Sequence, residues 1–262
     1  MNRFLSKAGM SYLKKGTGPV VIFIHGWAMA STVWVNQLDY FSGKGFTAAA
    51  PDLRGHGYSL DKGPYTVSQM ASDLNDFIDE MGYNDLFLVG WSMGGMILLE
   101  YMERFPEKAS SLILVGSTPR FVTDDHHSFG LPQKDLRAMQ TRLKRDFHRA
   151  VFEFRKSITD GIKEANKKII LQAPLPSYDA AMSGLKELMV LDLSSELSDI
   201  NIPVLVVHGS KDRVCKLSAS RYMADSIPGA ELLIIKSSDH APFLHDSELF
   251  NFKVEEFLKK HG

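Results

Sequence analysis

The chain has 262 residues, of which 44% are hydrophobic and 23% are charged, as in ordinary globular proteins. Its 30 Lys and Arg against 31 Asp and Glu give a formal charge of −1, which offers no reason to expect a nucleic-acid partner. The longest apolar run has fewer than ten residues, whereas a membrane helix needs about 20, and the polar start lacks the apolar run of a signal peptide. With one cysteine, Cys215, these features predict a cytoplasmic protein that binds no membrane.

Short runs rich in Val, Ile and Leu recur along the chain, and such continuous runs are typical of strands buried on both faces. We expect strands at residues 19–24, 46–50, 85–89, 111–115, 203–207 and 231–235. Helical spacing of apolar residues lies between or after them, at residues 68–81, 93–104, 217–227 and 248–259. This order predicts an α/β fold with a mostly parallel, doubly wound sheet.

The alternation stops between residues 118 and 201, where no convincing strand occurs. Amphipathic stretches at residues 132–156 and 157–171 indicate helices, and prolines such as Pro119 and Pro203 bound the segment. We therefore expect an α/β core at residues 1–118 and 201–262, with a helical lid at residues 119–200 inserted between two core strands.

The segment Gly90-Trp91-Ser92-Met93-Gly94 follows a predicted strand and precedes a predicted helix. A G-x-S-x-G sequence in that context is typical of a nucleophile elbow, in which a sharp turn lifts the serine hydroxyl clear of the backbone. The adjacent helix N-terminus favours a negative charge formed on attack. Ser92 is therefore the predicted nucleophile.

A serine nucleophile needs a histidine base and a carboxylate that orients it, in the chain order Ser, Asp, His. Asp212 and His240 each follow a predicted strand, so the carboxyl edge of the sheet would bring them to Ser92. We expect His245 to lie in the cap region of the final helix, and His208 to be a packed core group.

Two backbone amides are candidates for an oxyanion hole. Trp27 follows His25-Gly26 after the first long strand, and Met93 follows the elbow serine. His25 is expected to brace its loop. For Trp91, lining of an apolar pocket and plain core packing are both open.

No residue set indicates a cofactor. The run Asp124-Asp125-His126-His127 offers metal-ligand side chains, but four consecutive loop residues rarely converge on one ion. We expect neither a metal nor any other cofactor.

The motifs His25-Gly26-Trp27, Asp52-Leu53-Arg54-Gly55-His56-Gly57, the elbow, Asp212 and His240-Ala241-Pro242-Phe243 resemble the α/β-hydrolase fold superfamily. Within it, the lid entrance Ser117-Thr118-Pro119-Arg120-Phe121 and the His-Ala-Pro-Phe sequence most resemble the BioH-type pimeloyl-[acyl-carrier protein] methyl ester esterases of biotin synthesis. Arg54 departs from that family, whose members often have proline there.

The resemblance implies that Ser92, Asp212 and His240 form a catalytic triad and that Trp27 and Met93 contact the acyl oxygen. It also implies that the lid segment Met139, Gln140, Thr141, Arg142 and Leu143 contacts the substrate. The implied reaction is hydrolysis of a methyl ester carried by an acyl carrier protein. We expect the protein to act as a monomer without cofactors.

Residues 131–168 carry eleven Lys and Arg against five Asp and Glu, so this segment has a charge of +6 and the remainder −7. Clustered basic residues steer acidic partners, and the acyl carrier protein that the resemblance implies is strongly acidic. We expect Arg137, Arg145, Arg149 and Arg155 to form a docking face, with a merely solvated helix face as the alternative.

Two other functions stay open on the sequence. One keeps the fold and changes the reaction, to broad carboxylesterase activity or carbon–carbon bond hydrolysis. The other is a ligand receptor that retains the hydrolase scaffold.

Overall fold

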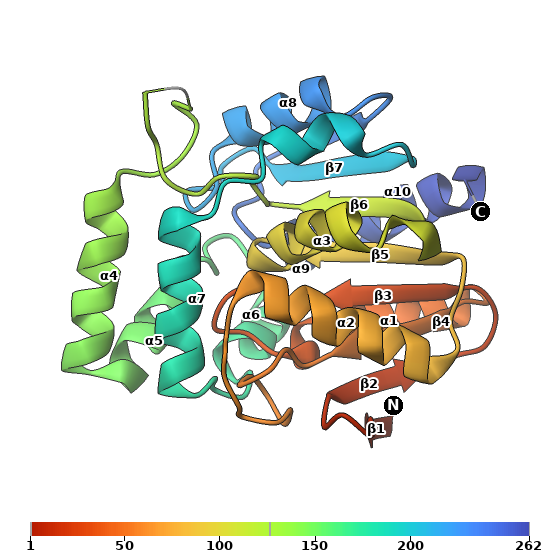
Figure 1. Ribbon diagram of the computed structural model, residues 1–262, viewed down its shortest axis with the longest axis horizontal. Helices are drawn as coiled ribbons and strands as arrows, with labels where there is room; N and C mark the ends of the chain where they lie inside the picture. The colour runs from red at the N-terminus through yellow and green to blue at the C-terminus, as the bar shows by residue number, and fades with distance from the viewer. Residues whose placement is uncertain (1, 126, 262) are drawn as a thin grey trace.

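A single sheet organises the computed structural model, which describes residues 2–125 and 127–261 (Figure 1). Its strand order is β1-β2-β4-β3-β5-β6-β7-β8; β2 pairs antiparallel with β1 and β4, and the other neighbours are parallel. The predicted fold class, a mostly parallel α/β-hydrolase sheet, is confirmed. The strands are β1 Asn2–Leu5, β2 Ser11–Lys15, β3 Val20–Ile24, β4 Thr47–Pro51, β5 Leu86–Trp91, β6 Ala109–Val115, β7 Val204–Gly209 and β8 Glu231–Ile235.

Helices cover both faces of the sheet, which explains why β3 and β5 at its centre are apolar along their length. Ile22 and Leu88 pack in one core cluster with residues of α2, α3 and α8, whereas Val21, Phe23 and Val89 pack in a second cluster with α1 and α10. The alternation follows from the pleat of a strand. The core helices are α1 Val35–Gly43, α2 Val67–Met81, α3 Met93–Arg104, α8 Leu217–Ser226, α9 Pro242–His245 and α10 Ser247–His261, with short 3-10 helices η1 Ser31–Trp34 and η2 Pro106–Lys108.

The helices described between β6 and β7 form what we call the lid: α4 Gln133–Arg145, α5 Phe147–Ser157, α6 Glu164–Leu171 and α7 Tyr178–Val190, followed by the 3-10 helix η3 Ser195–Asp199. In Figure 1, α4, α5 and α7 lie beyond the ends to which the arrows of β3, β6 and β7 point. The lid therefore faces the carboxyl edge of the sheet, where ligands bind in open α/β folds.

One of the expected lid helices is divided in two. The stretch expected as one helix, residues 132–156, is interrupted at Asp146, whose backbone is extended with φ −157° and ψ 96°. The Asp146 carboxylate accepts a hydrogen bond from the Arg149 N–H at 3.1 Å. Asp146 thus caps the N-terminus of α5, which separates α5 from α4.

The hairpin of β1 and β2 was not expected, because the start of the chain is polar and has no continuous apolar run. In the structure β1 is exposed along its whole length. None of the helices in the described part of the chain is long and apolar enough to cross a membrane.

Candidate active site

Ser92 occupies a sharp turn between β5 and α3. Its backbone has φ +56° and ψ −119°, a region that residues other than glycine rarely adopt, and its side chain is 7% exposed. Glycines allow the close packing around it: a Cβ on Gly90 would lie 2.6 Å from Gly94 O, and a Cβ on Gly94 would lie 2.5 Å from Ile24 O. The geometry is that of a nucleophile elbow.

Asp212 and His240 meet in the loops after β7 and β8. His240 Nδ1 lies 2.9 Å from Asp212 Oδ2, and the two side chains are 1% and 0% exposed. Backbone N–H groups of Val214 and Cys215 donate to Asp212 Oδ1 at 2.8 and 3.0 Å. Burial alone would raise the pKa of Asp212, but the charge and hydrogen bond of His240, the charge of His208 and the Val214 N–H outweigh it, so the pKa is lowered. Asp212 is therefore held as a carboxylate.

Trp91 connects the elbow to the histidine loop. Its indole Nε1–H donates to His240 O at 2.8 Å, and its ring packs edge-on against Phe243 with centroids 5.0 Å apart. The elbow is also tied to β6, because Ser92 N donates to Val115 O at 2.9 Å and Ser117 Oγ donates to Ser92 O at 2.8 Å. Of the two interpretations open for Trp91, core packing is the one the structure supports.

Trp27 and Met93 flank Ser92. A Cβ on Gly26 would lie 3.1 Å from Ser92 Cβ, so the turn that carries Trp27 passes directly beside the elbow. Met93 is the first residue of α3, and its N–H is one of the amides that have no partner within a helix. Both amides thus come from the segments that would flank an oxyanion on Ser92.

A cavity of about 340 Å³ opens above Ser92, beneath the lid. Its lining is mostly apolar and comes from the core and from α4, α5 and α7: Trp27, Ser92, Phe121, Leu131, Asp135, Leu136, Ala138, Met139, Arg142, Phe154, Ser157, Leu185, Leu188, Arg213 and Val214. An apolar cavity with a few polar groups is suited to an acyl chain.

Comparisons with known proteins agree with this fold. A family model described as alpha/beta hydrolase fold matches residues 19–247. The chain belongs to the alpha/beta hydrolase fold family. It is similar to two proteins named pimeloyl-[acyl-carrier protein] methyl ester esterase: one from Nitrosomonas europaea, 31% identical over 90% of this chain and 94% of that protein, and one from Nitrosospira multiformis, 28% identical over 93% and 96%.

Solved structures of α/β hydrolases resemble this one closely. An esterase from Exiguobacterium antarcticum superposes with a TM-score of 0.89, at 26% identity and 98% coverage of both chains. A bromoperoxidase from Bacillus anthracis gives a TM-score of 0.91 at 23% identity, with 98% of this chain and 100% of that one covered, which shows the shared fold. Fold and relatives together make this α/β hydrolase an enzyme that acts on ester bonds.

The lid of this hydrolase brings only part of the expected substrate segment to the cavity. Met139 and Arg142 line it, but Gln140, Thr141 and Leu143 do not. Leu143 is instead buried in the core cluster, and the Thr141 hydroxyl donates to Arg137 O at 3.0 Å. Five consecutive residues of an α-helix cannot share one face, which corrects the expectation for these three.

Other cavity residues could have been found from the same helical rule. Asp135 and Ala138 lie four residues before Met139 and Arg142, on the same face of α4. Phe154, Leu185 and Leu188 gave no such signal, because the sequence does not show how α5 and α7 turn toward α4.

The basic lid residues divide into two groups. Arg137, Arg145 and Arg149 are exposed, as a docking face requires. Arg155 is only 2% exposed, so its expected place on that face was wrong. Its guanidinium points into the protein, toward the turn after β3.

Several histidines have structural surroundings. His25 Nε2 accepts from Leu53 N at 3.0 Å and its Nδ1 lies 2.9 Å from Gly26 O, which fits the expected brace. His208 is fully buried beside Ser220 Oγ at 2.7 Å, as a packed core group. The cap region of the final helix contains Asp246, whose carboxylate accepts from Leu249 N at 3.1 Å.

Asp124, His127 and Asp192 bring three metal-ligand side chains close together; His126, which the sequence pattern also offered, lies outside the described residues. Arg120 pairs with both carboxylates and lies 2.9 Å from Asp124 Oδ2. The positive charge at this cluster therefore comes from an arginine, and we assign no metal to it.

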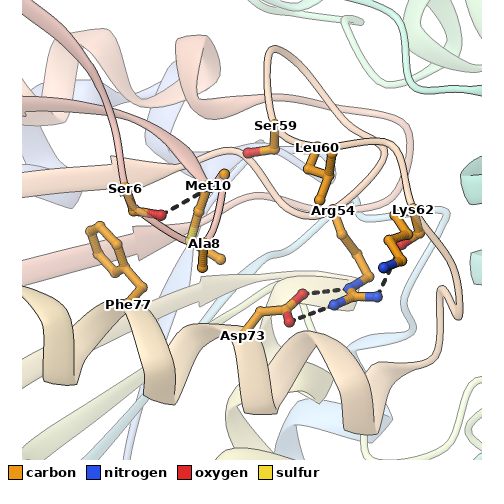
Figure 2. A pocket seen from close by; sticks show the side chains of 10 residues that line it. Ser6, Ala8, Met10, Arg54, Ser59, Leu60, Lys62, Asp73 and Phe77 are labelled. Carbon is orange, nitrogen blue, oxygen red and sulfur yellow. Dashed lines mark hydrogen bonds and ion pairs between the residues drawn. The ribbon is translucent and has the colours of Figure 1, made fainter.

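Arg54, the departure from the esterase pattern, lies beside a second cavity of about 60 Å³ under the β1–β2 hairpin (Figure 2). Its guanidinium forms a two-point ion pair with Asp73 and donates to the carbonyl oxygens of Lys62 and Pro64 at 3.0 and 2.9 Å. Arg54 thus holds the loop before α2 against that helix, and its donors are used within the protein.

Proposed function

We propose that this protein is a serine carboxylesterase that hydrolyses the methyl ester of pimeloyl-[acyl-carrier protein] in biotin synthesis. The observation that carries the proposal is the buried Asp212–His240 pair, with 2.9 Å between Oδ2 and Nδ1, in loops adjoining the Ser92 elbow. The substrate is the one in the names of the relatives from Nitrosomonas europaea and Nitrosospira multiformis.

The first half of the reaction forms an acyl-enzyme. His240 takes the proton of Ser92 Oγ through Nε2, since its Nδ1 is engaged by Asp212. Ser92 Oγ attacks the methyl ester carbonyl, and the resulting oxyanion accepts hydrogen bonds from the Trp27 and Met93 amides. His240 then returns the proton to the leaving oxygen, so methanol departs and the pimeloyl group stays on Ser92.

The second half repeats these steps with water. His240 removes a proton from a water molecule, which attacks the acyl-enzyme carbonyl through a second oxyanion intermediate. Transfer of that proton to Ser92 Oγ releases the free carboxylic acid and restores the enzyme. The carboxylate of Asp212, with its lowered pKa, stabilises the imidazolium in both halves.

The carrier protein would dock on the outer face of the lid. Arg137, Arg145 and Arg149 are exposed on α4 and α5, and Phe152, three residues after Arg149 on α5, is 50% exposed. Exposed basic side chains with an exposed aromatic one suit an acidic partner that also has an apolar contact. Since Met139 and Arg142 of α4 line the cavity, a carrier on α4 would lie close to the acyl chain it delivers.

The test measures the hydrolysis of methyl-pimeloyl carrier protein. Mass spectrometry detects the conversion of its methyl ester to the free acid. Ser92→Ala should lower the rate by several orders of magnitude, because the nucleophile is gone. Ser198→Ala, which removes an exposed hydroxyl from η3, is the control and should leave the rate unchanged. Hydrolysis by Ser92→Ala at the wild-type rate would refute the nucleophile; no hydrolysis of this substrate by the wild-type enzyme would refute the substrate.

A second candidate is a broad carboxylesterase with no carrier partner. The similarity to the esterase from Exiguobacterium antarcticum and the mostly apolar lining of the cavity favour it. A kcat/KM for free methyl pimelate and p-nitrophenyl butyrate equal to that for the carrier-bound ester would support this candidate. Restoration of biotin-independent growth in a cell without its pimeloyl ester esterase would support the first.

A further inference from the structure

Arg155 is an arginine on the inner face of the lid whose guanidinium is buried with only main-chain partners. Its Nε and Nη2 donate to Ala28 O at 3.2 and 2.7 Å, Nη1 donates to Ala173 O at 2.5 Å, and Nη2 donates to Pro174 O at 2.9 Å. Among the described residues no carboxylate pairs with it. Burial lowers the pKa of Arg155 to about 10, so the side chain remains charged at neutral pH.

A buried charge without a counterion is costly unless hydrogen bonds compensate for the water it loses. A lid helix needs no such residue in order to pack: Val151, one turn earlier on the same face of α5, is fully buried and apolar. The reason for a buried arginine at this position must therefore lie in the groups that it contacts.

The main acceptor, Ala28 O, belongs to a strained turn beside the active site. Met29 N donates to Gly26 O at 3.3 Å, so residues 26–29 form a tight turn with Trp27 and Ala28 in its centre. Ala28 has φ +56°, a left-handed conformation that alanine rarely adopts and that persists only where surrounding contacts impose it. Two hydrogen bonds from Arg155 to the Ala28 carbonyl supply such contacts.

The lid also holds the other side of this turn. The Trp27 indole Nε1–H donates to Ala181 O of α7 at 2.8 Å, and the Trp27 ring packs edge-on against Phe154 of α5 with centroids 5.0 Å apart. The turn is thus fixed between α5 and α7. A displacement of the turn would move the Trp27 amide relative to Ser92, to which it is adjacent through Gly26.

We propose that Arg155 is a positioning residue for the oxyanion hole: by binding Ala28 O it holds the turn of residues 26–29 so that the Trp27 amide faces the acyl oxygen on Ser92. This rests on the proposed function, since it assumes an oxyanion at Ser92. Oxyanion donors act through fixed geometry, and a misplacement of about 1 Å costs up to about 100-fold in rate. Loss of Arg155 should therefore lower kcat and leave ground-state binding nearly intact.

The experiment compares Arg155→Ala, Arg155→Lys, Ser92→Ala and the control Lys156→Met, which removes a neighbouring exposed charge from α5. The substrate is p-nitrophenyl butyrate, which needs no carrier protein. We expect kcat to fall about 10- to 100-fold in both Arg155 variants, with KM within about twofold of wild type. Lys156→Met should match the wild type.

Two further measurements separate positioning from general packing. Phenylboronic acid forms a tetrahedral adduct on a nucleophilic serine, so its affinity for the Arg155 variants should fall by about the same factor as kcat. Ethylguanidinium, which fits the space vacated in Arg155→Ala, should restore part of kcat in that variant and have no such effect on Arg155→Lys.

The proposal is overturned if a folded Arg155→Ala enzyme keeps kcat within twofold of wild type, or loses kcat with boronate affinity unchanged. If Arg155→Ala does not fold, the kcat and boronate affinity of Arg155→Lys decide in the same way. Activity of Ser92→Ala at the wild-type level would overturn this inference together with the proposed function. An inactive Ser92→Ala beside wild-type-like Arg155 variants would overturn this inference alone.

Discussion

In the core, the carboxylate of Asp212 and the imidazole of His240 are buried, and neighbouring backbone amides fix the carboxylate. On the outer face of the lid, Arg149 and Glu153 form an ion pair while 69% and 49% exposed. The structure thus holds pairs of acidic and basic side chains in two ways. A buried pair depends on its partners, whereas an exposed pair exchanges freely with water and salt.

The proposed function assigns different tasks to these two regions. Chemistry needs one fixed arrangement of proton donors and acceptors, which burial provides. Recognition of a charged macromolecule works over a distance of several ångströms and is served by mobile surface charges. Core variants should therefore change the chemical step regardless of the substrate's carrier, and lid-surface variants should act only when a carrier is present.

The largest effect is expected for Asp212→Asn. An amide at this position presents an N–H group to His240 Nδ1 and favours the wrong tautomer of the base, so kcat should fall about 10⁴-fold on free and carrier-bound esters alike. The measurement is steady-state kinetics, with Asp225→Asn on the exposed face of α8 as the control. A loss of less than about tenfold would mean that Asp212 does not orient the base.

A smaller and selective effect is expected on the lid. Reversal of Arg137, Arg145 and Arg149 to Glu should lower kcat/KM for the carrier-bound ester about 10- to 100-fold, because steering of an acidic carrier is lost. Free methyl pimelate should be turned over within about twofold of the wild-type rate. Reversal of Lys7, Lys62 and Lys236, which are exposed on the core, is the control.

Salt gives an independent test of the same comparison. Exposed charges are screened within about 8 Å at physiological ionic strength, so added salt should reduce the wild-type preference for the carrier-bound ester. Equal losses on both esters in the lid variant would indicate a disturbed lid, and no loss on either would show that the basic segment is only a solvated face.

The smallest effect concerns folding and belongs to the core. Burial lowers the pKa of His56 from 6.5 to about 3, with the nearby His25 contributing. Its Nδ1 lies 2.9 Å from Arg54 O, and its buried Nε2 has no partner among the described residues. Between these two pKa values the His56 side chain is protonated in the unfolded chain and neutral in the folded chain. The contribution of His56 to the free energy of unfolding is therefore fully present above about pH 6.5 and decreases as the pH falls.

His56→Asn removes this titration while keeping a donor for Arg54 O. The pH dependence of the unfolding free energy, from urea titrations between about pH 5.5 and 4, should become shallower by about 1.4 kcal/mol per pH unit. Ser198→Ala, which removes an exposed hydroxyl that does not titrate in this range, should keep the wild-type slope. Identical slopes for wild type and His56→Asn would mean that His56 is protonated in the folded protein.

The sequence predicts the interior of this fold better than its edges. Helix α3 begins and ends at the expected residues, 93 and 104, because the elbow fixes its start and the apolar spacing continues to its last turn. The β1–β2 hairpin gave no signal, since an exposed edge strand needs no apolar run. Helix α7 was also not expected, although Ser177 caps it by accepting from Ala180 N at 3.2 Å.

For the site, spacing along the chain locates residues at strand ends. It does not locate lid side chains that reach into the core. Asp212 and His240 meet because parallel strands align their carboxyl ends. Arg155 was assigned to the surface from its charge, yet Val151, Arg155 and Ile158 follow helical spacing, which places them on one face. Periodicity was the better guide there, because it reports the direction of a side chain and charge does not.

The three tryptophans have an optical consequence. Trp34 stacks on Phe243 with centroids 4.1 Å apart, and Trp91 packs on the same ring, so both indoles lie in the second core cluster beneath the sheet. Trp27 differs from both, because it lies in the first core cluster and contacts α7 through Ala181 and α5 through Phe154. Its indole fluorescence should therefore change when α5 or α7 is displaced, which makes Trp27 a built-in reporter of the position of these two helices.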